Sequence, residues 1–214
     1  MASRPPRPHF AGPWHGLLVA ALLGVSTIVA AGTIRGDLFR DEEHRIQLKK
    51  PATWHFVPAE QASSRARGAL PEGIRGEQAA PATLLVAVSE SPPGAQVSYP
   101  ARVTLAVENL TSRPGVESLE AYAQANLRTL DTLLEDFKLE GRAERVKAGG
   151  MPGLRVEYTG RVARPGGSVA IRGIALHFLR GTIGYAIAAV ARAEDFAARR
   201  ATLQQILGSV NFLP

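Results

Sequence analysis

The chain has 214 residues, no cysteine and a formal net charge of +6 at pH 7. The absence of cysteine excludes disulfides, thiolate metal sites, a cysteine nucleophile and a lipid anchor on an N-terminal cysteine. The basic residues are scattered, without a long basic block or a basic stripe with interleaved aromatic residues. We therefore expect no nucleic-acid partner.

An apolar run, Leu17 to Ile34, follows a proline-rich leader in which Arg4 and Arg7 are the only charged side chains. The run is at the short end of the length that crosses a bilayer as a helix. We favour an uncleaved membrane anchor, and the alternative is a secretory signal cut near Ala31. Arg4 and Arg7 favour a cytoplasmic N-terminus, so the rest of the chain is expected in the periplasm or outside the cell.

The sequence divides into four predicted parts. They are a cytoplasmic leader at 1–15, an anchor or signal at 16–34, a linker at 35–43 and one globular domain at 44–214. The membrane contact is expected through residues 17–34. The last part is long enough to bury a sizeable core as a single domain.

The first half of this domain contains short strands and a loop. His44–Leu48 and Trp54–Pro58 are predicted strands, with Pro51 in a hairpin-like turn between them. Residues 61–81 are rich in small residues and predict a long surface loop. Two further strands are predicted at Thr83–Ser89 and Arg102–Glu108.

Helical periodicity follows at 117–137, where leucine and other apolar residues recur at spacings of three and four. Asp195 is a candidate N-cap for a second helix that Gly208 ends. Between the helices lie predicted strands at 154–161, 168–179 and 183–190, and a short strand at 209–212 closes the chain. This order predicts an α+β fold in which two helices flank a mainly antiparallel sheet.

The chain resembles the PsbP family of proteins, together with bacterial envelope proteins of the DcrB and LpqN type. The resemblance is carried by the segments IQL with Pro51 and Trp54, SLEAYA at 118–123, GGMPGLRVEY at 149–158, GYAI at 184–187, Phe196 and ILGSVNF at 206–212. It covers roughly residues 45–212. It implies an α/β/α sandwich, export or membrane anchorage, and an accessory or scaffold role without a shared catalytic motif.

No residue pattern predicts chemistry. His44 and His55, with Glu42 or Glu43, are the one candidate metal set, but their spacing favours an exposed structural pair. His177 is interpreted as structural, on the opposite side of its strand from Leu176 and Phe178. The segment 149–153 lacks the lysine and hydroxyl of a phosphate loop and is interpreted as a tight turn. We expect no enzyme activity, no catalytic or metal site and no cofactor.

Two functions remain open for such a domain. The first is an accessory or scaffold protein that binds a partner protein. Its possible interface residues are Trp54, Tyr99, Tyr158 and Arg161, because aromatic residues and arginine are enriched at binding hot spots. For Trp54, core packing is the favoured interpretation. The alternative function is a periplasmic carrier of a small ligand or lipid, with a pocket between the sheet and the helix at 117–137.

Overall fold

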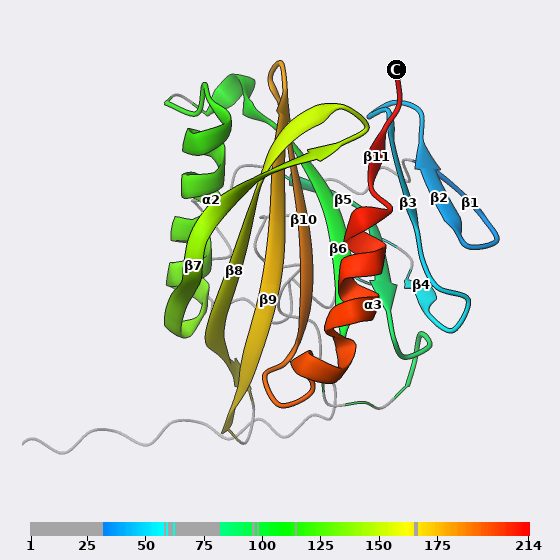
Figure 1. Cartoon of the computed structure of the whole chain (residues 1–214), viewed down its shortest axis with the longest axis vertical. Coiled ribbons are helices and arrows are strands. Elements are labelled where there is room, and N and C mark those ends of the chain that lie inside the picture. The colour runs from blue at the N-terminus through cyan, green and yellow to red at the C-terminus, as the bar shows by residue number, and fades with distance from the viewer. Residues whose placement is uncertain are drawn as a thin grey trace, which may run out of the picture.

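The structure is a computed structural model that describes residues 32–57, 59, 62, 82–95, 97, 99–113, 115–164 and 167–214. Antiparallel strands dominate it (Figure 1). In chain order the elements are β1 Thr33–Arg35, β2 Leu38–Asp41, β3 Ile46–Lys49, β4 His55–Val57, β5 Ala82–Ser89, β6 Arg102–Asn109, the 3₁₀ helix η3 Leu110–Ser112, α2 Leu119–Leu133, β7 Glu135–Ala148, β8 Met151–Arg164, β9 Gly167–Arg180, β10 Ile183–Arg192, α3 Phe196–Gly208 and β11 Asn211–Phe212.

The strands form two sheets. The larger has seven strands in the order β4-β5-β6-β10-β9-β8-β7, and the smaller has four in the order β1-β2-β3-β11. Every pair in both sheets is antiparallel. Tight turns join β7 to β8 and β9 to β10. Strands that follow each other in the chain therefore pair as antiparallel neighbours, as in a β-meander.

The two helices cover opposite faces of the seven-stranded sheet. On one face, Leu130 of α2 packs in a buried cluster with Val156 and Tyr158 of β8. On the other face, Leu203 of α3 packs in a second cluster with Leu105 of β6 and with residues of the four-stranded sheet. The prediction of an α+β fold with two helices flanking a mainly antiparallel sheet is therefore confirmed.

The helix α2 is shorter than its predicted range of 117–137. It begins after Ser118, whose hydroxyl accepts a hydrogen bond from the Ala121 backbone N–H at 3.1 Å. It ends at Leu133, and Leu134 already has extended backbone angles. The apolar spacing runs on past the helix because Leu134, just before β7, and Phe137 within β7 join the same buried cluster as α2.

The hairpin predicted around Pro51 is wrong. The strand β3 pairs with β2 and β11, whereas β4 pairs with β5 in the other sheet. The segment between them carries the chain from one sheet to the other, with the Trp54 N–H donating to the Pro51 carbonyl at 3.0 Å. Two strands that belong to different sheets cannot form a hairpin ladder with each other.

The predicted linker at 35–43 forms regular structure in part. Residues 33–41 contain the hairpin of β1 and β2, and β2 continues the sheet to β3. Phe39 is buried in the α3-side cluster, which gives this hairpin a core anchor despite its charged neighbours. The last two residues of the range predicted as an anchor or signal, Thr33 and Ile34, thus lie in β1.

Two sequence predictions concern segments beyond the described residues. The apolar run up to Ala31 lies there, and so does nearly all of the predicted loop at 61–81, except that Ala62 is helical and buried. In the part of the chain that the structure describes, no helix combines the length and the apolar character needed to cross a bilayer.

Candidate functional site

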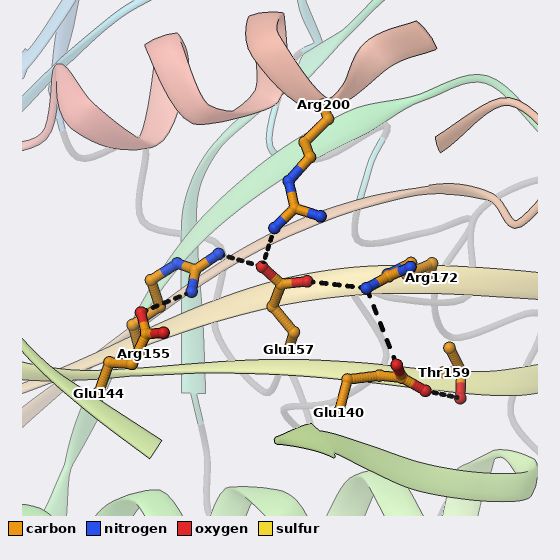
Figure 2. A network of polar contacts seen from close by, with 7 residues as sticks. All are labelled: Glu140, Glu144, Arg155, Glu157, Thr159, Arg172 and Arg200. Atoms are coloured by element: carbon orange, nitrogen blue, oxygen red, sulfur yellow. Dashed lines mark hydrogen bonds and ion pairs between the residues drawn. The ribbon is translucent and has the colours of Figure 1, made fainter. Parts of the chain in front are cut away.

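Polar side chains gather on the α3-facing side of β7, β8 and β9. Alternate residues of a strand point to opposite faces, so when Val156 and Tyr158 enter the α2-side core, Glu157 must face α3. Arg172 of β9 and Arg200 of α3 reach the same place from elements far away in the sequence. We call these residues, with Glu140, Glu144, Arg155 and Thr159, the Glu157 network (Figure 2).

Glu157 is the centre of the network and is only 8% exposed. Its Oε1 accepts hydrogen bonds from Arg155 and from Arg200, and its Oε2 accepts one from Arg172 at 3.2 Å. A carboxylate with three guanidinium donors has both oxygens satisfied, which is what a buried charge requires. The arrangement ties α3 to two neighbouring strands of the sheet.

The rim of the network is more exposed and carries the balancing negative charges. Glu144 pairs with Arg155 at 2.8 Å, and Glu140 lies 3.8 Å from Arg172. Figure 2 shows these carboxylates on the side of Glu157 away from Arg200. With them, the network has equal numbers of glutamates and arginines. Their formal charges cancel, so the network has no large net charge.

Phe196, the first residue of α3, supports two of the arginines. The guanidinium carbon of Arg172 lies 5.2 Å from the centroid of its ring, and that of Arg200 lies 5.9 Å away. Such distances fit cation–π contact. The aromatic ring is buried in the α3-side core, so the polar network and the apolar core share one boundary.

The electrostatics of the network hold Glu157 ionised. Burial alone would raise its pKa, but the hydrogen bond and charge of Arg155, together with Arg200 and Arg172, outweigh burial and lower the pKa. Burial opposes the charge of Arg155 too, yet its bonds to Glu157 and Glu144 raise the pKa of that guanidinium. A carboxylate that stays ionised at neutral pH is poorly suited to exchange protons as a general acid or base. The network is therefore suited to binding or to structural support.

Three of the four predicted interface residues belong to the core. Trp54 is 4% exposed, Tyr99 is 2% exposed and Tyr158 is fully buried. Their side chains stabilise the two clusters and offer no surface to a partner in this structure. For Trp54 this agrees with the favoured interpretation of core packing.

Arg161 is the predicted interface residue that is exposed. It lies on β8 four positions after Glu157, and therefore on the same face of the sheet. Its Nε donates to the Ser168 hydroxyl oxygen at 2.8 Å. Arg161 thus extends the polar surface of the Glu157 network along β8.

His44 and His177 have contacts that fit a structural role. His44 does not pair with His55 across a hairpin, because β3 and β4 belong to different sheets. Instead, Asp41 accepts bonds from the His44 backbone N–H at 2.9 Å and lies 3.1 Å from its ring Nδ1, closing the turn between β2 and β3. Both oxygens of Asp41 thus serve this turn. His177 is buried and faces α2, opposite to Leu176 and Phe178, as predicted.

The other predicted features can be placed as well. Gly149 and Gly150 form the turn between β7 and β8 with positive φ angles of 53° and 80°, which confirms the tight turn. Leu130 and Tyr158 belong to one buried cluster between α2 and the sheet, the place where a carrier pocket was predicted. Across the described ranges, no group of three or more histidine or acidic side chains is placed to hold a metal ion.

The sequence analysis did not identify the Glu157 network. One signal was available, since the alternation of β8 puts Arg155, Glu157 and Thr159 on one face. The partners on β9 and α3 lie 15 and 43 residues beyond Glu157. No local pattern joins them, so only the three-dimensional fold reveals the cluster.

The sequence matches no protein-family model and no curated protein. Solved structures do resemble the fold. Cyanobacterial PsbP (CyanoP) from Synechocystis sp. PCC 6803 aligns over 86% of this chain and 97% of its own, with a TM-score of 0.51 and 10% identity. LpqN of Mycobacterium tuberculosis, described as involved in cell envelope biogenesis, aligns over 79% of this chain and 83% of its own, with a TM-score of 0.48 and 13% identity. The predicted PsbP-like fold is therefore confirmed, and the chain has the fold of CyanoP.

Proposed function

We propose that this chain is a non-catalytic accessory or scaffold domain, held at a membrane by residues 17–34, which binds a partner protein outside the cytoplasm. The observation that carries the proposal is the Glu157 network with Arg161 beside it. It is an ordered polar cluster beside α3 with a buried centre at Glu157 and an exposed rim of Glu140, Glu144 and Arg161.

The charges of this surface suit recognition more than chemistry. Arg155, Arg172 and Arg200 are held in place by Glu157 before any partner arrives. Fixed side chains lose little conformational entropy on binding, which favours affinity. Arginine is also enriched at binding hot spots. The carboxylate rim of Glu140 and Glu144 then sets which charges a partner must present.

The neighbouring edge of the sheet is a poor alternative surface for a partner. The edge strand β7 is mostly exposed and carries many charged side chains. Its pairing with β8 shifts register between Glu135 and Lys138 and again between Glu140 and Glu144. Charges and bulges on an edge strand discourage the addition of another strand. We therefore place the partner on the face of the sheet.

Site-specific photocrosslinking in native membranes tests the proposed surface. A photoreactive residue at 144 or 161, in the full chain, is expected to join a protein of one defined mass. The matched control is a photoreactive residue at Gln124, an exposed position on α2 on the other side of the sheet. Adducts of equal mass and yield from all three positions, or none from 144 and 161, would contradict a partner at this face.

The location is tested separately with reporter fusions. Residues 1–40 fused to a reporter that is active only in the periplasm should give activity in a bacterial host. The same fusion without 17–34 is the control and should give none. Activity of a cytoplasm-dependent reporter in place of the periplasmic one would overturn the proposed location.

A further inference from the structure

A second surface lies at the end of the molecule where β11, the β7–β8 turn and the β9–β10 turn meet. It is an open groove of about 600 Å³. Its walls include the apolar side chains of Met151, Leu179 and Phe212, and its cationic groups are Arg45 and Arg180. Its lining contains no acidic side chain. The groove and the Glu157 network share the strands β8 and β9, but no residue belongs to both.

The groove is shaped by close packing at Gly149. A Cβ atom at this position would lie 2.4 Å from the Asn211 Oδ1 and 2.7 Å from the Phe212 backbone N. The β7–β8 turn therefore rests directly on β11, as Figure 1 also shows. The rigid contact fixes one wall of the groove against the four-stranded sheet.

Arg180 has spare hydrogen-bonding capacity. Its Nη2 donates to the Leu213 carbonyl at 3.3 Å, and its guanidinium carbon lies 5.2 Å from the centroid of the Phe212 ring. Its Nη1 is buried without a hydrogen-bond acceptor. A buried donor on a cation that lacks an acceptor is costly. The half-buried Arg180 side chain nevertheless brings a positive charge to the lining of the groove.

Arg45 supplies the second cation from the turn between β2 and β3. Its carbonyl accepts a hydrogen bond from the Leu213 N–H at 2.8 Å, which holds its backbone beside the groove. Its side chain is exposed. Among the ion pairs between described residues, neither Arg45 nor Arg180 has a carboxylate partner.

The sheet register places this groove near the end of the apolar run. Thr33 pairs with Arg40, Arg40 pairs with Gln47, and Gln47 pairs with Asn211. These residues form one row across the four-stranded sheet. Strands lie about 4.8 Å apart, so three spacings separate Thr33 from the groove residue Asn211 by roughly 14 Å.

From this geometry we propose that the groove binds the headgroup of an anionic phospholipid in the bilayer that holds the apolar run. The phosphate lies between Arg45 and Arg180, and the apolar walls face the glycerol and the first methylenes of the lipid. The inference rests on the membrane attachment proposed above. It gives the domain a second contact with the membrane and so fixes its orientation on the surface.

The charge and the apolar walls of the groove both support this occupant. Basic residues near an anionic leaflet are attracted to it over about a Debye length, roughly 10 Å. Guanidinium groups bind phosphate oxygens with short charge-assisted hydrogen bonds. A groove that combines two such cations with apolar walls matches a molecule that is anionic at one end and apolar at the other.

Lipid titration of the full chain in neutral dodecyl maltoside micelles tests the proposal. Dioctanoyl phosphatidylglycerol should bind saturably, raise the melting temperature and slow hydrogen exchange at residues 211–213. Dioctanoyl phosphatidylcholine should bind much more weakly. The double variant Arg45→Ala/Arg180→Ala should weaken phosphatidylglycerol binding about 30-fold, and Arg45→Ala alone about fivefold.

Arg128→Ala/Arg142→Ala is the matched control, because it removes two exposed arginines from α2 and β7. It should bind phosphatidylglycerol as the unchanged chain does. The single variant Arg45→Ala keeps the test valid if loss of Arg180 disturbs Phe212, since the Arg45 side chain is exposed.

Three results would overturn the proposal. They are no saturable phosphatidylglycerol binding, equal weakening in both double variants, and the same exchange protection from inorganic phosphate alone, which would make the ligand a free anion. Crosslinking from positions 144 and 161 does not depend on Arg45 or Arg180. A failure of lipid binding is therefore distinguishable from a failure of partner binding.

Discussion

His177 is a buried polar residue between the seven-stranded sheet and α2. Its side chain lies on the α2 side of β9 at 2% exposure, and its Nδ1 has no hydrogen-bond partner. The ring of Tyr122 meets it edge to face, with centroids 5.9 Å apart. Gly184 makes room for Tyr122, because a Cβ atom there would lie 2.5 Å from its ring. A neutral imidazole can be accommodated at this position, whereas a charged one would lack compensation.

This environment predicts a pH-dependent stability. Burial lowers the pKa of His177 to about 4 from the ordinary value of 6.5. Between pH 6.5 and 4 the unfolded chain therefore binds a proton that the folded chain does not, so acidification destabilises the fold. The loss should approach about 3 kcal/mol over this range, since each pKa unit corresponds to about 1.4 kcal/mol.

Chemical denaturation at several pH values measures this effect. The variant His177→Leu should lose the slope between pH 4 and 6.5 and keep the rest of the acid dependence. His44 provides the contrast, because its bond to Asp41 raises its pKa although burial opposes this. Its contribution to stability is present below pH 6.5 and is lost as the pH rises through its raised pKa. An unchanged slope in His177→Leu would show that the histidine is already solvated in the fold.

The helices and strands differ in how well the sequence predicts them. Strands β5, β6, β9 and β10 are predicted nearly to their ends, because a strict alternation or a short apolar run dominates each of them. The strand β7 has no clear alternation that would predict it, because its side chains are mostly exposed. The hairpin of β1 and β2 is missed for a related reason. Its one buried apolar residue is Phe39, between the half-buried Leu38 and the exposed Arg40.

The N-termini of the two helices allow a matched test at the scale of the element. Ser118 accepts a hydrogen bond from the Ala121 N–H, whereas Asp195, also at an N-cap position, accepts none with its side chain. Ser118→Ala should therefore lower the free energy of unfolding by about 1 kcal/mol. Asp195→Ala should cost only a few tenths of a kcal/mol, through the lost charge near the N-terminus of α3.

Urea denaturation of the two variants measures this difference. Ser118→Asp restores an acceptor and should recover most of the stability that Ser118→Ala loses. If Ser118→Ala and Asp195→Ala lower the free energy of unfolding by the same amount, the hydrogen bond of the Ser118 hydroxyl does not stabilise α2.

At the scale of the whole molecule, the sequence predicts the layers better than the connections between them. Local periodicity identifies α2, α3 and the long strands, and their order implies helices on two faces of one sheet. The second sheet depends on β11 meeting β3 across the entire length of the domain. The Glu157 network likewise joins β7, β8, β9 and α3. Such pairings depend on which surfaces meet after folding, and a single sequence contains no local trace of them.

The network provides the last prediction, because it connects α3 to the sheet through one carboxylate. Glu157→Gln keeps the shape of the side chain but leaves Arg155, Arg172 and Arg200 without their shared negative charge. At pH 7 the free energy of unfolding should fall by about 1–3 kcal/mol, the cost of unsatisfied charged partners. Glu144→Gln is the control. Its exposed rim carboxylate should contribute less than about 1 kcal/mol.

The pH dependence of this variant gives an independent check. The pKa of Glu157 is lowered in the fold, so its contribution is present above pH 4.5 and is lost as the pH falls through the lowered value. The stability difference between the unchanged chain and Glu157→Gln should therefore shrink in acid. A difference that stays constant down to low pH would contradict an ionised Glu157.

Arg161→Ala should leave the free energy of unfolding nearly unchanged. If this variant alone also loses crosslinking to the partner, partner recognition is separated from the structural role of the network.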